Sequence, residues 1–79
     1  MQLDLMFSKK LSIKISYKKL WIYLIEKNMK RTDLIKLTGI TSNTLANMGK
    51  NEYISMKNLE KICKAMNMTP SEILEFVED

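Results

Sequence analysis

Residues 30–50 read KRTDLIKLTGITSNTLANMGK, and this stretch decides the fold. Its first half has the features of a short helix that begins at Thr32, a residue type suited to the N-cap position. Asp33 follows, and its negative charge is favoured at the positive end of the helix dipole. Gly39 is predicted to end this helix, because glycine adopts the left-handed backbone conformation at little cost.

The second half of the stretch predicts another short helix directly after the glycine. Thr41 is the predicted N-cap, the helix covers about 42–48, and it stops near Gly49. Leu45 and Met48 fall on the side that would face a core. The remaining positions are polar and comprise Ser42, Asn43, Thr44 and Asn47. Two short helices joined by a tight glycine turn predict a helix-turn-helix.

A more apolar helix is predicted before this stretch, with Ser16 as its N-cap and an end near Asn28. One face carries Tyr17, Leu20, Trp21 and Leu24, which are spaced as in an amphipathic helix. Off that face lie Ile22, Tyr23 and Ile25. Because the middle of this helix is apolar nearly all round, we expect its outer side to be covered as well.

Two further helices are predicted after the stretch. One begins around Ser55, and its buried stripe is Leu59, Ile62, Cys63 and Met66. The last has a strong start signal, with Thr69 as N-cap, Pro70 at the first helical position and Glu72 three residues after the cap. The apolar residues of this last helix, which we expect in the core, are Ile73, Leu74, Phe76 and Val77.

The N-terminal region has a different pattern. Residues 10–17 alternate between polar and apolar side chains, which is the period of a β-strand. A single strand has no partner within a helical domain, so this segment is either a mobile arm or a strand that pairs with another copy of the chain. We therefore divide the chain into an arm or strand over 1–15 and a helical domain over 16–79. The expected fold class is all-α, with five helices and one short N-terminal strand.

The composition excludes most catalytic chemistry. A chain of 79 residues suffices for one domain. It has no histidine and a single cysteine, Cys63, which excludes an internal disulfide, a zinc site built on histidine or cysteine, and a histidine base. No residue set for nucleophilic catalysis or for cradling a phosphate is present. We expect a protein that is not an enzyme and that uses no metal, cofactor or small-molecule ligand.

The net charge of +4 is unevenly distributed along the chain. Residues 71–79 hold four acidic residues and no basic one, so residues 1–70 carry 13 basic against five acidic residues, a balance of +8. A basic body favours a polyanionic partner. No apolar run approaches the roughly 20 residues that span a membrane, and the N-terminus lacks the pattern of a signal peptide. Together with the lone cysteine, these features predict a cytoplasmic protein.

The spacing of these signals resembles the phage-repressor or Cro-like helix-turn-helix family, also called the xenobiotic response element type. The resemblance covers about residues 17–77 and looks like a compact, Firmicute-type branch. The positions that carry it are Leu34, Ile35, Gly39, Ile40, Thr44, Leu45, Ile54, Ser55 and the segments LEKICKAM (59–66) and NMTP (67–70). The fold that it implies is the five-helix, lambda-repressor-like domain. The function that it implies is a sequence-specific double-stranded DNA-binding transcriptional regulator of the repressor kind.

In such domains the second helix of the motif lies in the major groove, so the resemblance implies that the helix over 42–48 reads base edges. Asparagine suits adenine, because its amide donates and accepts at once. Arg31 and Thr32 would face a phosphate at the start of a helix, and Lys50 would reach the DNA backbone. The DNA-binding residues expected on this basis are Arg31, Thr32, Thr41, Ser42, Asn43, Thr44, Asn47 and Lys50, with Thr44 the weakest candidate.

One family feature is missing. Many relatives carry a glutamate at the end of the second motif helix, paired with an arginine in the first helix of the domain. This sequence has Gly49 and Leu24 at those positions, so that ion pair is absent. Apolar packing can replace such a pair at little cost in stability.

Two expectations about partners follow. The unpaired strand and the apolar outer side of the first helix predict a homodimer, which would also place two reading helices on two half-sites. The alternative function is a protein-interaction module, such as an antitoxin or a co-regulator, on the same fold. It stays open because no lysine or arginine lies among residues 42–48.

Overall fold

The two short helices of the predicted helix-turn-helix form where the sequence places them. They are α3 (Asp33–Thr38) and α4 (Ser42–Gly49). Gly39 between them has a φ of 80°, in the left-handed region that glycine enters without a Cβ clash. The Thr41 hydroxyl accepts a hydrogen bond from the Thr44 N–H at 3.1 Å, which confirms the predicted N-cap of α4.

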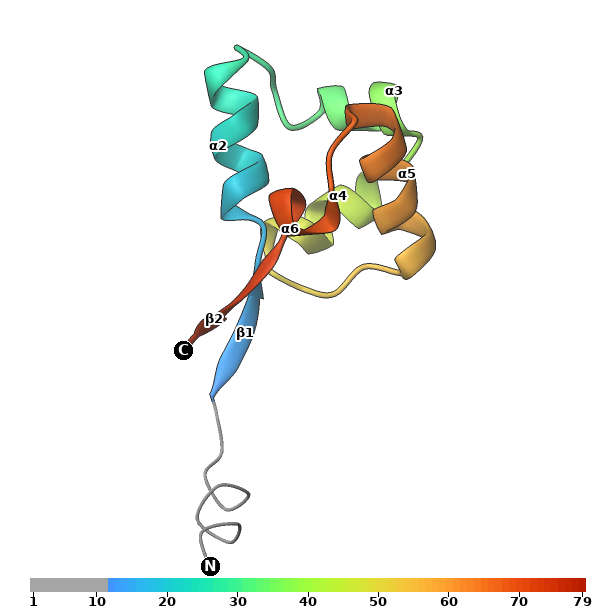
Figure 1. The fold of residues 1–79 in the computed structure, drawn as a ribbon. Coiled ribbons are helices and arrows are strands. Elements are labelled where there is room, and N and C mark those ends of the chain that lie inside the picture. Colours follow the sequence, from blue (N-terminus) through green and yellow to red (C-terminus); the bar gives the residue numbers. More distant parts are fainter. Residues whose placement is uncertain (1–11) are drawn as a thin grey trace, which may run out of the picture.

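The computed structural model of the protein describes residues 12–79. Its elements, in chain order, are β1 (Ile13–Ser16), α2 (Lys18–Glu26), α3, α4, α5 (Met56–Met66), α6 (Pro70–Ile73) and β2 (Glu75–Glu78) (Figure 1). Most of the arm predicted over 1–15 lies outside the described residues. The five predicted helices are therefore present, and a second strand follows them.

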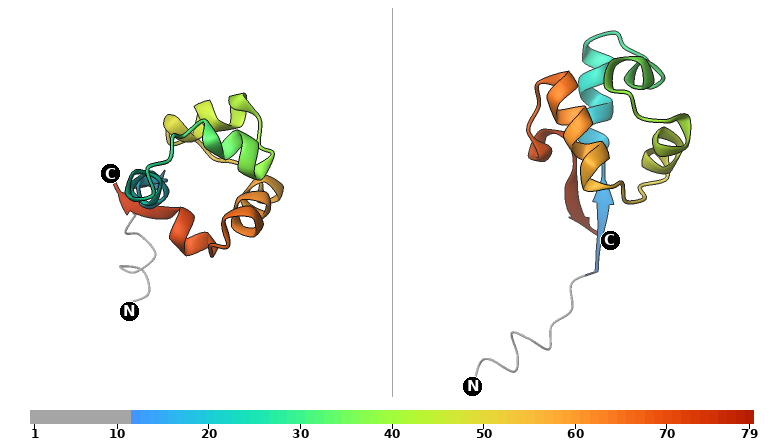
Figure 2. Two further views of the ribbon diagram at one scale, coloured as in Figure 1. Left: turned by 90° about the horizontal axis from the view of Figure 1, so that it is seen from above. Right: turned by 90° about the vertical axis from the view of Figure 1, so that its right-hand side faces the viewer.

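The helices surround one hydrophobic core. Seen from above, α2, α3, α5 and α6 surround a common centre, and α4 overlaps α3 in this view (Figure 2). The buried apolar residues come from every helix and from the start of the chain's described part: Ile15, Tyr17, Leu20, Leu24, Leu34, Ile40, Met48, Leu59, Ile62 and Ile73. Met48, a predicted inward residue of α4, has no exposed surface. Its burial turns the polar side of α4 away from the core.

Helix α2 is shorter at both ends than the sequence suggested. Ser16 does not cap it in the predicted way, because Ser16 ends β1 and Tyr17 is the N-cap residue. The predicted end at Asn28 is also wrong, because Asn28 has a φ of 56° and cannot continue a helix. The Met29 N–H instead donates to the Leu24 carbonyl at 2.8 Å and closes the end of α2.

The prediction of a long last helix is wrong beyond Ile73. Its start is as expected, since the Thr69 N–H donates to the Glu72 carboxylate at 2.9 Å. Leu74 then adopts an extended backbone, with φ −139° and ψ 162°, and the chain continues as β2. Phe76, which we expected in the core, is 57% exposed. Phenylalanine and valine favour strands, and β1 supplies the backbone partners that a four-residue strand needs.

The strand β1 pairs with β2 in a two-stranded antiparallel sheet, with Ile15 opposite Phe76 (Figure 1). The strand signal is confirmed over Ile13–Ser16, but the inference that this strand lacks a partner in its own chain is wrong. The partner lies at the far end of the sequence. Ile15 is buried and anchors the sheet on the helical core.

Tyr17 links the start of α2 to the loop after α4. Its side chain is fully buried, and its hydroxyl donates to the Glu52 backbone carbonyl at 2.6 Å. Burial raises the pKa of Tyr17, and the negative charge that Tyr53 can carry raises it further. The folded chain therefore keeps the Tyr17 phenol neutral beyond its usual range.

We predict that Tyr17→Phe lowers the free energy of unfolding by about 1 kcal/mol near neutral pH, the net value of a typical hydrogen bond. The raised pKa means that neutral Tyr17 contributes stability that is complete below about pH 10 and is lost as the pH rises through the folded-state pKa. The phenylalanine variant lacks that loss, so the stability difference between the two proteins should shrink at alkaline pH. Denaturant unfolding from neutral pH to about pH 11 measures this difference.

The control for that experiment is Tyr23→Phe, which removes a tyrosine from the partly exposed side of α2. Near neutral pH it should change the free energy of unfolding by less than Tyr17→Phe does, because the Tyr23 hydroxyl makes no hydrogen bond within residues 12–79. A stability difference for Tyr17→Phe that does not change with pH would contradict the role assigned to burial.

Candidate nucleic-acid interface

The outward face of α4 consists of small side chains. Successive residues of an α-helix are about 100° apart, so Ala46 lies between Ser42 and Asn43 when the helix is viewed along its axis. All three are exposed, and the buried Met48 lies on the opposite side. The face presents a hydroxyl, an amide and a methyl group, and no large side chain keeps another surface away from the α4 backbone.

Two of the predicted reading residues lie at the margin of this face. Asn47 and Thr44 are both half-buried. The Thr44 hydroxyl lies 3.1 Å from the Thr41 hydroxyl and accepts a hydrogen bond from the Asn58 amide at 3.4 Å. The bond from Asn58 ties the first turn of α4 to α5, so it gives Thr44 a role in holding α4 in place.

The sequence interpretation missed Ala46. It lies one helical turn after Ser42 and is exposed, like Ser42 and Asn43 at the start of α4. It carries no polar group, so the pattern of polar side chains in the sequence does not identify it. The available signal was helical periodicity, because the position opposite Met48 must face outward. An alanine methyl suits apolar contact with the methyl group of thymine.

The predicted backbone-contacting residues flank this face. Arg31 and Thr32 lie in the turn that leads into α3, Lys50 directly follows α4, and all three are exposed. Thr32 occupies the predicted N-cap position, but its side chain makes no capping hydrogen bond. The Asp33 carboxylate accepts the Lys30 N–H at 2.9 Å instead.

Arg31 is held against the end of α4. Its guanidinium lies 3.9 Å from the centroid of the Trp21 ring, and its Nη1 atom lies 3.6 Å from the position that a Cβ would take at Gly49. Leu24 is buried in the core. The ion pair that the sequence lacks is therefore not replaced by apolar packing alone, because a cation stacked on an indole ring occupies the end of α4.

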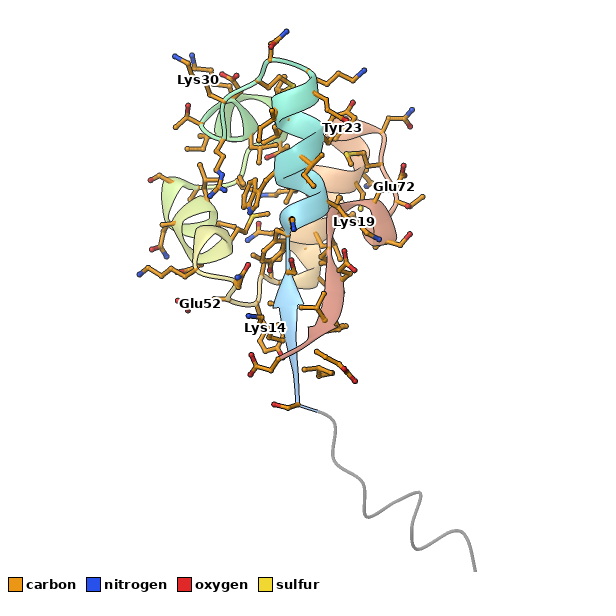
Figure 3. All side chains as sticks on the ribbon, turned by 90° about the vertical axis from the view of Figure 1, so that its left-hand side faces the viewer. Lys14, Lys19, Tyr23, Lys30, Glu52 and Glu72 are labelled. Atoms are coloured by element: carbon orange, nitrogen blue, oxygen red, sulfur yellow. The ribbon has the colours of Figure 1, made fainter. Side chains whose placement is uncertain are left out.

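The acidic C-terminal residues lie on another side of the molecule. Glu75 is 3.8 Å from the Lys19 ammonium, and Asp79 is 3.7 Å from the Lys14 ammonium. Figure 3 shows Lys19 and Glu72 on one side of α2 and α4 on the opposite side. Hydrogen bonds from Thr69 hold the pKa of the Glu72 carboxyl below its usual range, so its charge persists in mild acid. The negative charge of the C-terminal residues thus lies on another side of the molecule than α4.

Other kinds of site find no support in the described part of the chain. Among residues 12–79, no three potential metal-ligating side chains come together. No helix within this range is long and apolar enough to cross a membrane. Cys63 is half-buried against the core, and burial raises the pKa of its thiol, as expected for a small structural residue.

The capped α4, held beside α3 by a left-handed glycine, makes the fold a helix-turn-helix module of the kind that binds nucleic acid. Residues 19–79 match the family described as the Cro/C1-type HTH DNA-binding domain, and the chain belongs to this family. This confirms the resemblance inferred from the sequence. It also confirms the five-helix, lambda-repressor-like fold, to which the structure adds a small two-stranded sheet.

Individual proteins agree with this assignment. The chain is 37% identical over 60 residues to the uncharacterized HTH-type transcriptional regulator YozG of Bacillus subtilis (strain 168), which covers 73% of this chain and 71% of that protein. It superimposes on a crystal structure of the transcriptional regulator VanUg (Form II) with a TM-score of 0.80 and 34% identity. That match covers 89% of this chain and 93% of the VanUg chain. The chain is thus a DNA-binding regulator of the HTH type, and its family is not one of enzymes.

We predict that Thr41→Ala destabilises the protein by about 1 kcal/mol, because it removes the side-chain oxygen that accepts the Thr44 N–H. Thr32→Ala is the matched control, since Thr32 holds the same position in α3 without a capping bond. Its effect should stay within about 0.5 kcal/mol. Thermal or denaturant unfolding distinguishes the two variants, and equal losses would show that the cap of α4 contributes nothing particular.

Proposed function

We propose that the protein is a sequence-specific regulator that places α4 in the major groove of double-stranded DNA. The observation that carries this proposal is the exposed, small and polar face of α4, capped at its start and backed by buried Met48. A major groove about 12 Å wide admits one helix. Small outward side chains let that helix approach the base edges closely.

The proposed contacts fall into two groups. Base edges are read from the start of α4, where Asn43 can donate to and accept from one adenine and Ser42 can bond in either direction. Phosphates are held from the flanks, by Arg31 and Lys50. The full proposed set is Arg31, Thr32, Thr41, Ser42, Asn43, Thr44, Asn47 and Lys50, to which we add Ala46.

We propose repression as the mode of action. A protein that occupies its site on DNA through one compact domain blocks other proteins from the same site. Such action requires DNA binding alone. Since the genome is its target, we place the protein in the cytoplasm.

We predict that Asn43→Ala loses about 1–3 kcal/mol of binding free energy at the cognate site and relaxes sequence preference at one position. The reason is the loss of one amide that pairs with a base edge. Sites selected from a random duplex pool with the parent protein provide the probe, and titration of parent and variant measures the change. If the variant binds the selected site as the parent does, α4 does not read bases through Asn43.

The comparison variant is Arg31→Ala. It should lower the affinity for every duplex by a similar factor, and it should reduce the slope of log affinity against log salt by about 1. Lys27→Ala is its control, because it removes the same charge from beside Tyr23 at the other side of α2 (Figure 3). The control should leave the salt slope unchanged. A loss at Arg31 confined to the selected site would contradict its assignment to phosphate.

We also propose that the protein binds DNA as a homodimer. Because β1 pairs with β2 of the same chain, an unpaired strand no longer supports a dimer. The outer side of α2 still does, because Ile22 is 45% exposed and Ile25 is 72% exposed. A second copy would cover these side chains across a two-fold axis. It would also supply a second reading helix for a half-site about 34–36 Å away.

We predict a dimer mass for the parent protein in sedimentation at micromolar concentration. Ile25→Glu should shift the mass to that of a monomer, because it places a charge in the apolar contact. Met56→Glu is the control, since Met56 is 79% exposed on a different helix. A monomeric parent, or equal masses for both variants, would contradict the proposed interface.

A second candidate function is that of a protein-interaction module, such as an antitoxin or a co-regulator. It is favoured by the neutral α4, which carries no lysine or arginine over 42–48, and by the apolar outer side of α2. The two candidates differ in one measurement. Binding to random duplex DNA that weakens with salt supports the regulator, whereas no affinity at low salt together with capture of a protein partner supports the module.

A further inference from the structure

Trp21 and Arg31 form a stack that the proposed DNA contacts do not by themselves explain. The guanidinium lies 3.9 Å from the ring centroid, which is a close cation–π arrangement. Trp21 is half-buried, packs against the hydrophobic core and is tilted against the Tyr17 ring at 6.3 Å. The indole is thus fixed by its surroundings, and it fixes the face of a long side chain that would otherwise be free to rotate.

The stack lies beside the outward face of α4. The Nη1 atom of Arg31 is 3.6 Å from the position of a Cβ at Gly49. Gly49 follows Ser42 and Ala46 at helical spacing along one side of α4, so the guanidinium sits at the end of that line. The absence of a side chain at Gly49 leaves the space that the guanidinium occupies.

The edge of the guanidinium has no partner within the described residues. The ion pairs between residues 12–79 involve only lysines, and no hydrogen bond in this range has Arg31 as side-chain donor. A guanidinium whose face is covered by an aromatic ring keeps its N–H donors in the plane of the group, where they match a phosphate. Arg31 is therefore oriented and still able to donate.

We propose that Trp21 is a positioning residue for the DNA backbone: it orders the Arg31 guanidinium at the end of α4 before DNA arrives. Ordering in the free protein reduces the conformational entropy that binding would otherwise remove. The inference rests on the proposed function. It gives half-buried Trp21 a role in DNA affinity in addition to its packing against the core.

The test is a double-mutant cycle read out as affinity for a labelled duplex of random sequence at low salt, because phosphate contacts need no particular sequence. Arg31→Ala should weaken binding roughly tenfold. Trp21→Leu, which keeps an apolar side chain but removes the ring, should weaken it roughly threefold. The double variant should bind no more weakly than Arg31→Ala alone, and Trp21→Phe should bind nearly as the parent does.

Tyr53→Leu is the control, since Tyr53 is an aromatic side chain that is 73% exposed and carries no cation stack within the described residues. It should leave DNA affinity unchanged. Circular dichroism of each variant confirms folding before the titration.

A second measurement needs no change at Trp21. It is the only tryptophan of the chain, so acrylamide quenching of its fluorescence reports this stack alone. DNA should protect Trp21 from the quencher in the parent protein and protect it less in Arg31→Ala. Additive losses in the cycle, or equal quenching of the parent with and without DNA, would overturn the role of Trp21 while leaving the proposed function standing. A parent that binds no duplex at all would overturn both.

Discussion

The burial of Met48 is the constraint on which the interface depends. Its side chain has no exposed surface and shares the core with residues from every other helix. Because Met48 points inward, the helical repeat fixes which residues lie on the opposite side of α4. These residues are Ser42, Asn43 and Ala46, and they must face outward. The cap at Thr41 fixes where α4 begins. The outward face is therefore a consequence of core packing.

Much of the fold could be predicted because its signals are local. A threonine cap, a left-handed glycine and a helical apolar stripe each act over a few residues, and the structure has them at Thr41, Gly39 and Met48. The strand β2 could not be predicted in this way. The segment Glu75–Glu78 is too short for its periodicity to distinguish a strand from the end of a helix. Its pairing with β1 makes it a strand, and β1 lies about sixty residues earlier in the sequence. Pairing between residues so far apart in the sequence produces no local sequence pattern by which β2 could be recognised.

The candidate site was predictable to a similar extent. Ser42 and Asn43 could be identified because polar side chains on an outward position are visible in the sequence. The hydrogen bond between Thr44 and Asn58 joins two helices, so it could be known only from the fold. The stack of Arg31 on Trp21 requires it too, because α2 and the turn before α3 must first come together. Ala46 is the exception. Helical periodicity alone could have identified it as an outward residue, but it was missed because its side chain is not polar.

The unpredicted sheet also has an electrostatic consequence. The ion pairs of Glu75 and Asp79 with lysines are exposed, so each contributes only about 0–1 kcal/mol to stability. Their position matters more than their strength. Because β2 pairs with β1, Glu75 and Glu78 lie within the sheet, and β2 leads away from α4 (Figures 2 and 3). Salt screens exposed charges over about 8 Å, so a carboxylate farther than this from a phosphate repels it only weakly. One short strand thus places the acidic end of the sequence beside Lys14 and Lys19, with which it forms ion pairs.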